Sequence, residues 1–243
     1  MNELAAEKGI VSERAAGKMD RIQLARKVRA IKQVDGGQCD FDILVRRSDG
    51  KVIGRLSPLR PATLGEGDLI AKLTAWRSRW MHCFLTQFAA TPSRTAKWLE
   101  RVVLPSDERV LFLIHTEAGV PVGHIGVCGL SPERAELDNL VRGEVGGDIQ
   151  LIYYAAQALL RWICGELKIL TINLHVLSSN SRAIILYERL GFRQINRERL
   201  YREITADGVN HYSGERREGD EEANFQYIEM VLACENTSCS DPA

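Results

Sequence analysis

Residues 172–192 constrain the fold of this chain more than any other stretch of its sequence. From Thr171 to Val176, polar and apolar side chains alternate strictly, which is the period of a strand with one buried face. Asn180 is a favourable N-cap residue, apolar positions then recur every three or four residues, and Gly191 stands where a left-handed C-cap is typical. The sequence therefore predicts a strand, a helix of about three turns and, from Phe192 onward, another extended segment.

The spacing of five residues in this stretch resembles the last motif of the GCN5-related N-acetyltransferases (GNATs), which often reads N-x-x-A-x-x-x-Y-x-x-x-G-F. The five residues are Asn180, Ala183, Tyr187, Gly191 and Phe192. The first three share one helix face because they are three and four positions apart. The resemblance implies that Asn180, Ala183 and Tyr187 line the site of the pantetheine arm and thioester of acetyl-CoA, with the Tyr187 hydroxyl as proton donor to the leaving thiolate. The alternative is a core tyrosine whose hydroxyl lies at the rim.

The same resemblance implies an α/β fold in which a mixed, mostly antiparallel twisted sheet is flanked by helices. The chain of 243 residues is long enough to bury a substantial core. We predict an N-terminal extension at residues 1–38, which is helical or partly disordered and loosely docked. The acyltransferase domain follows at residues 39–232, and residues 233–243 form a polar C-terminal tail.

Short apolar runs separated by turn residues predict the elements of the domain. The predicted elements are a hairpin at residues 41–56, strands at 110–115, 121–130, 135–142, 194–204 and 225–232, a long helix at 148–167, and a charged loop at 206–222.

Composition and charge exclude several classes of protein. A formal net charge of zero argues against a general nucleic-acid-binding protein. The six cysteines include no C-x-x-C pair and no metal-ligand spacing with the five histidines, so reduced thiols and no metal site are expected. Residues 1–30 are charged throughout, unlike a signal peptide, and no apolar run approaches the roughly 18 residues that span a bilayer. The sequence thus predicts a cytoplasmic protein without membrane contact.

Three polar residues interrupt the strands predicted for the centre of the sheet. His124 lies in one strand, and Glu136 and Asp138 share a face of the next strand because they are two positions apart. The resemblance implies that the third and fourth strands of a GNAT domain border the acceptor amine, where a histidine or carboxylate removes its proton. The sequence does not separate Glu136 from Asp138. A solvent-facing polar position is the alternative for each of the three residues.

A glycine-rich segment precedes the long predicted helix. Backbone N–H groups at a helix start bind phosphate, and glycines let the backbone approach it closely. The resemblance places the CoA pyrophosphate here, although the GNAT pattern Q/R-x-x-G-x-G/A is met imperfectly, since Val145 holds its first glycine position. The alternative is an ordinary glycine turn with Asp148 as N-cap. The predicted CoA-binding residues of this segment are Leu140, Val141, Arg142, Gly143, Gly146 and Gly147.

Trp76 and Arg77 occupy the first predicted helix of the domain. Together they resemble the GNAT branch that acetylates amino groups on nucleotide-linked sugars, where W-R-N is common, although Ser78 replaces the asparagine here. Arginine suits a diphosphate because its planar fork donates two parallel hydrogen bonds, and tryptophan offers a stacking face for a base or sugar. The alternative is a core Trp76 with Arg77 in a surface ion pair.

The resemblance therefore implies an N-acetyltransferase in which a primary amine attacks the acetyl-CoA thioester directly. The expected acceptor is a small molecule, a nucleotide-activated amino sugar. A protein N-terminus of the ribosomal-protein type and a non-catalytic CoA-binding or interaction domain are the alternatives. A homodimer is one option for the oligomeric state, which the sequence leaves open.

Overall fold

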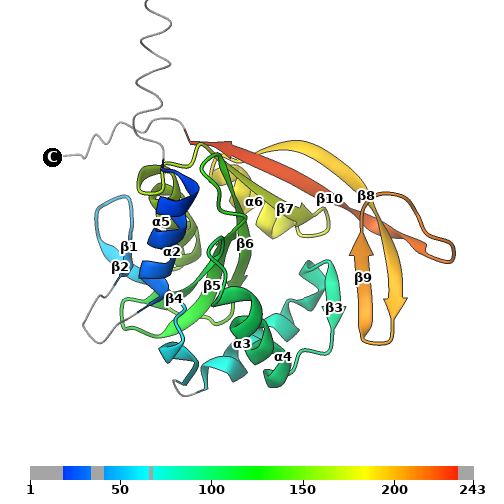
Figure 1. The fold of residues 1–243 in the computed structure, drawn as a ribbon, viewed down its shortest axis with the longest axis horizontal. Helices are drawn as coiled ribbons and strands as arrows, with labels where there is room; N and C mark the ends of the chain where they lie inside the picture. The colour runs from blue at the N-terminus through cyan, green and yellow to red at the C-terminus, as the bar shows by residue number, and fades with distance from the viewer. Residues whose placement is uncertain (1–18, 34–40, 66–67, 235–243) are drawn as a thin grey trace, which may run out of the picture.

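The protein is described by a computed structural model that covers residues 19–33, 41–65 and 68–234. Ten strands form one open sheet in the order β1-β2-β4-β5-β6-β7-β10-β8-β9-β3 (Figure 1). Every neighbouring pair is antiparallel except β6 and β7, which are parallel. The predicted mixed, mostly antiparallel sheet is thus confirmed.

The bounds of the elements agree with most of the predicted ones. The strands are β1 (Ile43–Arg46), β2 (Val52–Pro58), β3 (Thr86–Phe88), β4 (Val110–Thr116), β5 (Pro121–Cys128), β6 (Arg134–Arg142), β7 (Thr171–Leu177), β8 (Arg193–Thr205), β9 (Gly208–Tyr212) and β10 (Glu221–Ala233). The helices are α2 (Arg21–Lys32), α3 (Leu69–Arg79), α4 (Pro92–Trp98), α5 (Leu151–Gly165) and α6 (Ser181–Arg189), with short helical turns η1 (Ala62–Gly65), η2 (Met81–Cys83) and η3 (Leu99–Val103).

Helices cover the two faces of the sheet unequally. Phe112 of β4 packs edge-on against Trp162 of α5, whereas its neighbours Leu111 and Leu113 belong to a second apolar cluster with α3 and η3. Because successive strand residues point to opposite faces, α5 and α3 lie on opposite sides of β4. The second cluster includes residues of β4 and β6 but none of β7, β8 or β10. On that side of the sheet, the polar side chains of β7 and β10 therefore lack an apolar cover among the described residues.

Helix α2 is an integral part of the first apolar cluster. Its residues Leu24, Val28 and Ile31 are buried in it, and Lys27 forms an ion pair with Glu166 at the end of α5. Lys32 is buried and donates to two backbone carbonyls, at distances of 2.7 and 2.6 Å. The helix was predicted, but its loose docking was wrong, because three apolar residues on one stripe are enough to fix it to the sheet. Residues 1–18 lie outside the described part of the chain.

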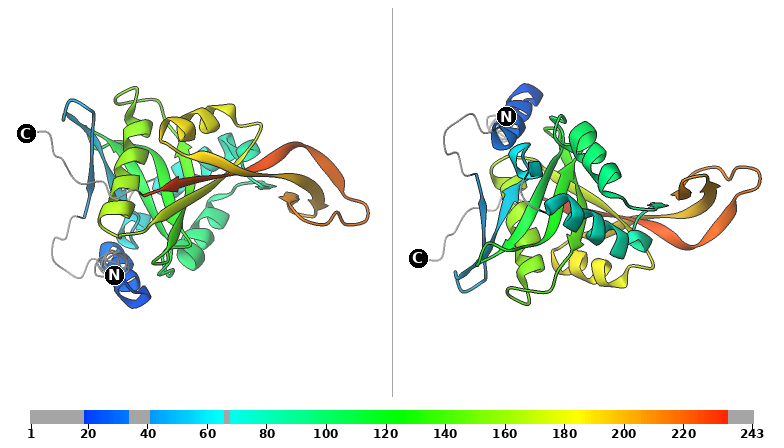
Figure 2. Two further views of the ribbon diagram at one scale, coloured as in Figure 1. Left: turned by 90° about the horizontal axis from the view of Figure 1, so that it is seen from above. Right: turned by 90° about the horizontal axis from the view of Figure 1, so that it is seen from below.

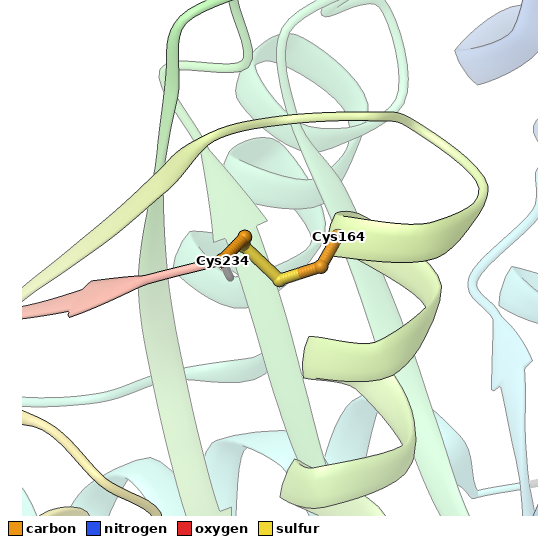
Figure 3. Close-up of a disulfide and its surroundings, with 2 residues drawn as sticks. All are labelled: Cys164 and Cys234. Carbon is orange, nitrogen blue, oxygen red and sulfur yellow. A yellow bond between two sulfur atoms is a disulfide. The ribbon is translucent and has the colours of Figure 1, made fainter. Parts of the chain in front are cut away.

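A disulfide joins Cys164, near the end of α5, to Cys234, just after β10 (Figure 3). The prediction that the cysteines are reduced is therefore wrong for these two. Cys83 and Cys128 are free, and the other two cysteines lie outside the described residues. Spacing could not reveal this pair, since 70 positions of sequence separate its members.

Strands β8, β9 and β10 form an arm that projects away from the body of the molecule (Figure 2). Strand β9 falls within residues 206–222, which were predicted to be a loop. This prediction was wrong for Gly208–Tyr212, because that segment pairs with β8 on one side and with β3 on the other. A short polar strand gains its stability from such neighbours rather than from a hydrophobic pattern of its own.

Candidate active site

Strands β6 and β7 pair over three residues only and then separate. The parallel register runs from Arg134 and Thr171 to Glu136 and Asn173. Beyond this point β6 stays paired with β5, and β7 stays paired with β10. The facing edges of residues 138–142 and 175–177 consequently have no ladder between them, and we call this place the strand opening. Unpaired strand edges can hydrogen-bond an extended ligand.

A β-bulge at Asn139 shapes the β6 side of the strand opening. Asn139 has a φ of 51°, and the register with β5 shifts between His124 and Gly126. Leu137 belongs to the cluster with α5, whereas Val141 belongs to the cluster with α3, although both have odd numbers. The extra residue in the bulge therefore reverses the face of the sheet to which the following odd-numbered side chains of β6 point.

Asp138 immediately precedes the bulge and is half-buried. Its Oδ2 accepts hydrogen bonds from Arg109 Nη1 and Asn139 Nδ2, both at 2.6 Å. These two donors hold the carboxylate at the start of the strand opening. Asp138, a predicted catalytic residue, thus lies at the start of the strand opening, with one of its oxygens already occupied.

His124 lies inside the interface between the sheet and α3. Its side chain stacks on Trp76 with ring centroids 6.1 Å apart, and its Nδ1–H donates to the carbonyl of Asn139 at 2.7 Å. Burial lowers the pKa of His124 to about 4, so the imidazole is neutral. The buried imidazole donates its hydrogen bond to the backbone of the bulge and therefore has a structural role. The prediction that His124 accepts the proton of the acceptor amine is corrected.

This burial predicts that stability depends on pH. The unfolded chain protonates His124 below its ordinary pKa of 6.5, whereas the folded protein does so only near pH 4. Stability is thus present above pH 6.5 and is lost as the pH falls. We expect the free energy of unfolding to drop by about 2 kcal/mol between pH 7 and pH 5 from this group alone. Urea titrations of wild type and His124→Gln measure it, and equal pH dependence in both would contradict the assignment.

Trp76 and Arg77 do not form the open substrate site that was predicted. Trp76 is fully buried, and its Nε1 donates to Glu144 Oε1 at 2.8 Å. A Cβ at Gly143 would come within 2.1 Å of its ring, so the two residues are in close contact. No face of Trp76 is free to stack on a base or sugar, which corrects that part of the prediction.

Arg77 lies beside the site but is largely engaged. Its guanidinium packs over the Phe84 ring at 3.4 Å from the centroid, and its Nη2 donates to the carbonyl of Thr86 at 3.0 Å. Burial lowers its pKa to about 10, while the charge of Asp138 opposes this shift, so Arg77 remains a cation at neutral pH. Its Nε is buried without a partner among the described residues.

The motif helix α6 follows β7, the strand on the other side of the strand opening. Asn180 caps it, since its side-chain oxygen accepts from the backbone N–H of Ala183 at 3.3 Å. Tyr187 is half-buried, and its ring meets Phe192 edge-on. Burial, followed by the negative charge of Asp138, raises the pKa of Tyr187 well above its usual value. Its hydroxyl therefore keeps its proton at neutral pH and is electrostatically coupled to Asp138 across the opening.

The glycine-rich segment is a loop that precedes α5. Gly146 and Gly147 have φ values of 156° and 67°. In the described part of the chain, no acceptor is found for the backbone N–H groups of residues 145–149. Such a run of free N–H groups before a helix fits an anion, as predicted for the CoA pyrophosphate.

Asp148 delays the start of the long helix. Its carboxylate accepts from the backbone N–H of Gln150 at 2.8 Å, and its carbonyl accepts from Leu151 at 3.0 Å. The helix predicted from residue 148 therefore begins at Leu151, after this turn. Asp148 also lies 3.4 Å from Arg47 Nη1, which partly neutralises its charge beside the loop. Val145 and Ile149 remain 95% and 85% exposed, so the loop presents apolar side chains to solvent.

The family model of the acetyltransferase (GNAT) domain matches residues 55–193 of the chain. The match spans more than half of the sequence and includes both sides of the strand opening. The chain belongs to the GNAT acetyltransferases. It is therefore an acyltransferase of this family.

Solved structures of GNAT proteins share the fold at low sequence identity. Spermidine N-acetyltransferase from Vibrio cholerae, in complex with CoA and spermine, is 15% identical, with a TM-score of 0.54 over 73% of this chain and 94% of that one. The nucleotide-linked sugar GNAT FdhC is 11% identical, with 0.54 over 80% and 90%. The ribosomal L7/L12 α-N-protein acetyltransferase RimL, in complex with CoA, is 11% identical, with 0.56 over 79% and 98%. No curated protein matches the chain at a significant level.

One polar residue at the GNAT strand opening, His175, was missed from the sequence, although its partner Glu136 was a predicted catalytic residue. His175 of β7 places its Nδ1 at 2.9 Å from Glu136 Oε1, and its ring stacks on Tyr227 of β10 with centroids 4.8 Å apart. The alternation of residues 171–176 already put His175 on the polar face of its strand. Nothing in the spacing indicated that Glu136 would lie beside it.

The side chains around this pair share the sheet face that lacks an apolar cover. Glu229 is paired with His175, and Glu198 is paired with Tyr227, so each pair lies on one face. No cluster of His, Cys, Asp or Glu that could hold a metal ion occurs in residues 19–33, 41–65 or 68–234. Over the same ranges, no helix is long and apolar enough to cross a membrane. We call the following set the polar face: Glu136, Asp138, Asn173, His175, Asn196, Glu198, Tyr227 and Glu229.

Proposed function

We propose that this GNAT protein transfers the acetyl group of acetyl-CoA to a primary amine at the strand opening. The observation that carries the proposal is the placement of Tyr187 and the glycine-rich loop. The loop supplies free N–H groups for the pyrophosphate, and Tyr187 keeps its proton beside the unpaired edges of β6 and β7. The thioester would lie between them, with Asn180 and Ala183 along the α6 side.

The acetyl group passes directly from CoA to the amine, without a covalent enzyme intermediate. The amine nitrogen attacks the thioester carbonyl carbon, the C–S bond breaks, and the CoA thiolate leaves. Unpaired backbone N–H groups of the β6 edge stabilise the oxyanion, and Tyr187 gives its hydroxyl proton to the thiolate. The product amide has lost two protons from the original ammonium group, of which one balances the new thiol and one is released.

Tyr187→Phe should lower kcat about tenfold while leaving the Kd of acetyl-CoA nearly unchanged. The substitution removes the proton donor but keeps the ring that packs against Phe192. Steady-state turnover and calorimetric binding of acetyl-CoA measure the two quantities. Full turnover of the variant across the pH range would show that Tyr187 only packs.

The sequence and the structure favour different acceptors. The sequence favours a nucleotide-activated amino sugar, and Arg77 remains as support for a diphosphate on this side. The polar face, however, carries the carboxylates of Glu136, Asp138, Glu198 and Glu229. Because clustered carboxylates attract cations and repel a diphosphate, we propose that a cationic amine is the better acceptor.

A panel of three amines tests both the proposed acetyl transfer and the proposed preference for a cationic acceptor. Spermidine, a peptide with a free N-terminus and a UDP-linked amino sugar are each incubated with acetyl-CoA, and thiol release and product mass are recorded. We expect the highest kcat/KM with spermidine. Binding of acetyl-CoA without turnover of any amine would instead favour a non-catalytic CoA-binding domain.

The cytoplasmic location and the homodimer remain predictions. The disulfide between Cys164 and Cys234 bears on the first, because disulfides persist mainly in oxidising compartments. Trapping the free thiols in cells and counting them by mass would determine whether this bond exists where the protein acts.

A further inference from the structure

The imidazole of His175 is held by two neighbouring side chains, Glu136 and Tyr227. Its Nδ1–H donates to the Glu136 carboxylate at 2.9 Å, which fixes the neutral tautomer with a lone pair on Nε2. No partner for Nε2 is found among the described residues, and 28% of the side chain is exposed. The ring is also held in its plane by Tyr227, whose ring is only 17° from parallel.

The position of His175 in the sheet places it inside the strand opening. The last pair between β6 and β7 joins Glu136 to Asn173, and His175 is two residues further along β7 on the same face. It is therefore the first polar side chain of β7 inside the strand opening. Asp138, the corresponding residue of β6, has its Oδ2 occupied by Arg109 and Asn139.

We propose that His175 is the general base that deprotonates the acceptor amine, and that Glu136 is its positioning residue. The inference rests on the proposed acetyl transfer and adds the step that precedes attack. The ammonium group of the acceptor gives one proton to Nε2 of His175, which becomes an imidazolium paired with Glu136. The freed nitrogen lone pair then attacks the thioester carbon, and the imidazolium later releases its proton to solvent. The catalytic arrangement is a histidine oriented by a carboxylate, as in other enzymes that use this pair.

The charged surroundings set the pH at which this base works. Glu136 on β6, Glu229 on β10 and Glu198 on β8 all raise the pKa of His175, the hydrogen bond with Glu136 being the largest cause, while burial opposes them. The other ionisable groups that face this site are Asp138 on β6, Tyr227 on β10 and Cys128 on β5, together with Arg109, which forms an ion pair with Asp138. Because a base acts only when unprotonated, kcat/KM should rise with pH through a pKa above the ordinary value of 6.5 for histidine.

His175→Asn is the decisive variant, since its amide N–H can still donate to Glu136 while Nε2 is lost. We expect kcat/KM for spermidine, or for whichever amine of the panel is turned over fastest, to fall about 100-fold at pH 7. The acidic limb of its pH profile should disappear, and the Kd of acetyl-CoA should stay unchanged. His82→Asn, at an exposed histidine of η2, is the matched control and should behave as wild type.

Glu136→Gln tests the positioning role with a readout that needs no turnover. The imidazole pKa of His175, followed by NMR of its ring protons, should fall toward the ordinary value, and the acidic limb of kcat/KM should move to lower pH with it. If wild type turns over no amine, the proposed function fails. If wild type is active but His175→Asn retains its acidic limb, or if Glu136→Gln leaves the NMR pKa of His175 unmoved, the base is another group.

Discussion

Loss of the disulfide between Cys164 and Cys234 should lower the free energy of unfolding by about 4 kcal/mol. The bond closes a loop of 70 positions that begins at the end of α5 and includes all of β7 and α6 and the arm. In the chain-entropy description, removing such a closure frees the unfolded chain to an extent worth about 4 kcal/mol at 25 °C. Urea unfolding of wild type with and without reductant measures the change.

The variant in which Cys164→Ser and Cys234→Ser are combined provides the control. Its unfolding midpoint should match that of the reduced wild type, and added reductant should not shift it further. A wild-type midpoint that is equal in oxidised and reduced samples would mean that the bond contributes nothing to stability.

Gly146→Asp should weaken acetyl-CoA binding about 1000-fold. A carboxylate about 4 Å from one phosphate charge costs about 4 kcal/mol at an effective dielectric constant of about 20. The added Cβ itself meets only Val122, at 3.6 Å, although the φ of 156° disfavours any side chain. Calorimetric titration with acetyl-CoA gives the Kd of folded variant and wild type.

Gly146→Asn separates the charge from the backbone effect, because asparagine has the shape of aspartate and the same strain. Its Kd should lie much closer to wild type than to Gly146→Asp. Equal losses in the two variants would assign the effect to the backbone, and no loss in either would place the pyrophosphate away from this loop.

Local periodicity predicted most elements of this fold. The features that it missed depend on tertiary contacts. The alternation of residues 171–176 and the capped helix after Asn180 reported β7 and α6 correctly, because each pattern depends on its own residues. Strand β9 was missed because its partners β8 and β3 are supplied from elsewhere in the chain. The disulfide was missed for the same reason.

The candidate site shows the same difference between features that depend on local sequence and features that depend on tertiary contacts. Tyr187 was assigned to the cofactor side from its motif, and Asp138 was one of three polar residues assigned to the acceptor side. In the structure, the charge of Asp138 contributes to raising the pKa of Tyr187. Trp76 and His124 were assigned roles that require exposure, which a sequence reports poorly for single aromatic residues. Their burial follows from the bulge at Asn139 and from Gly143, neither of which has a recognisable spacing.

The place of β10 in the sheet has a consequence for the order of assembly. This strand follows the nine others in the chain, yet it lies between β7 and β8. Strands β8, β9 and β3 therefore cannot join the rest of the sheet until β10 has been synthesised and inserted. Pairings of high sequence separation form slowly and leave edges exposed in the meantime. Since β10 also contributes Tyr227 and Glu229, the polar face is completed in the same late step, and a nascent chain that ends before β10 would carry the glycine-rich loop without a finished acceptor side.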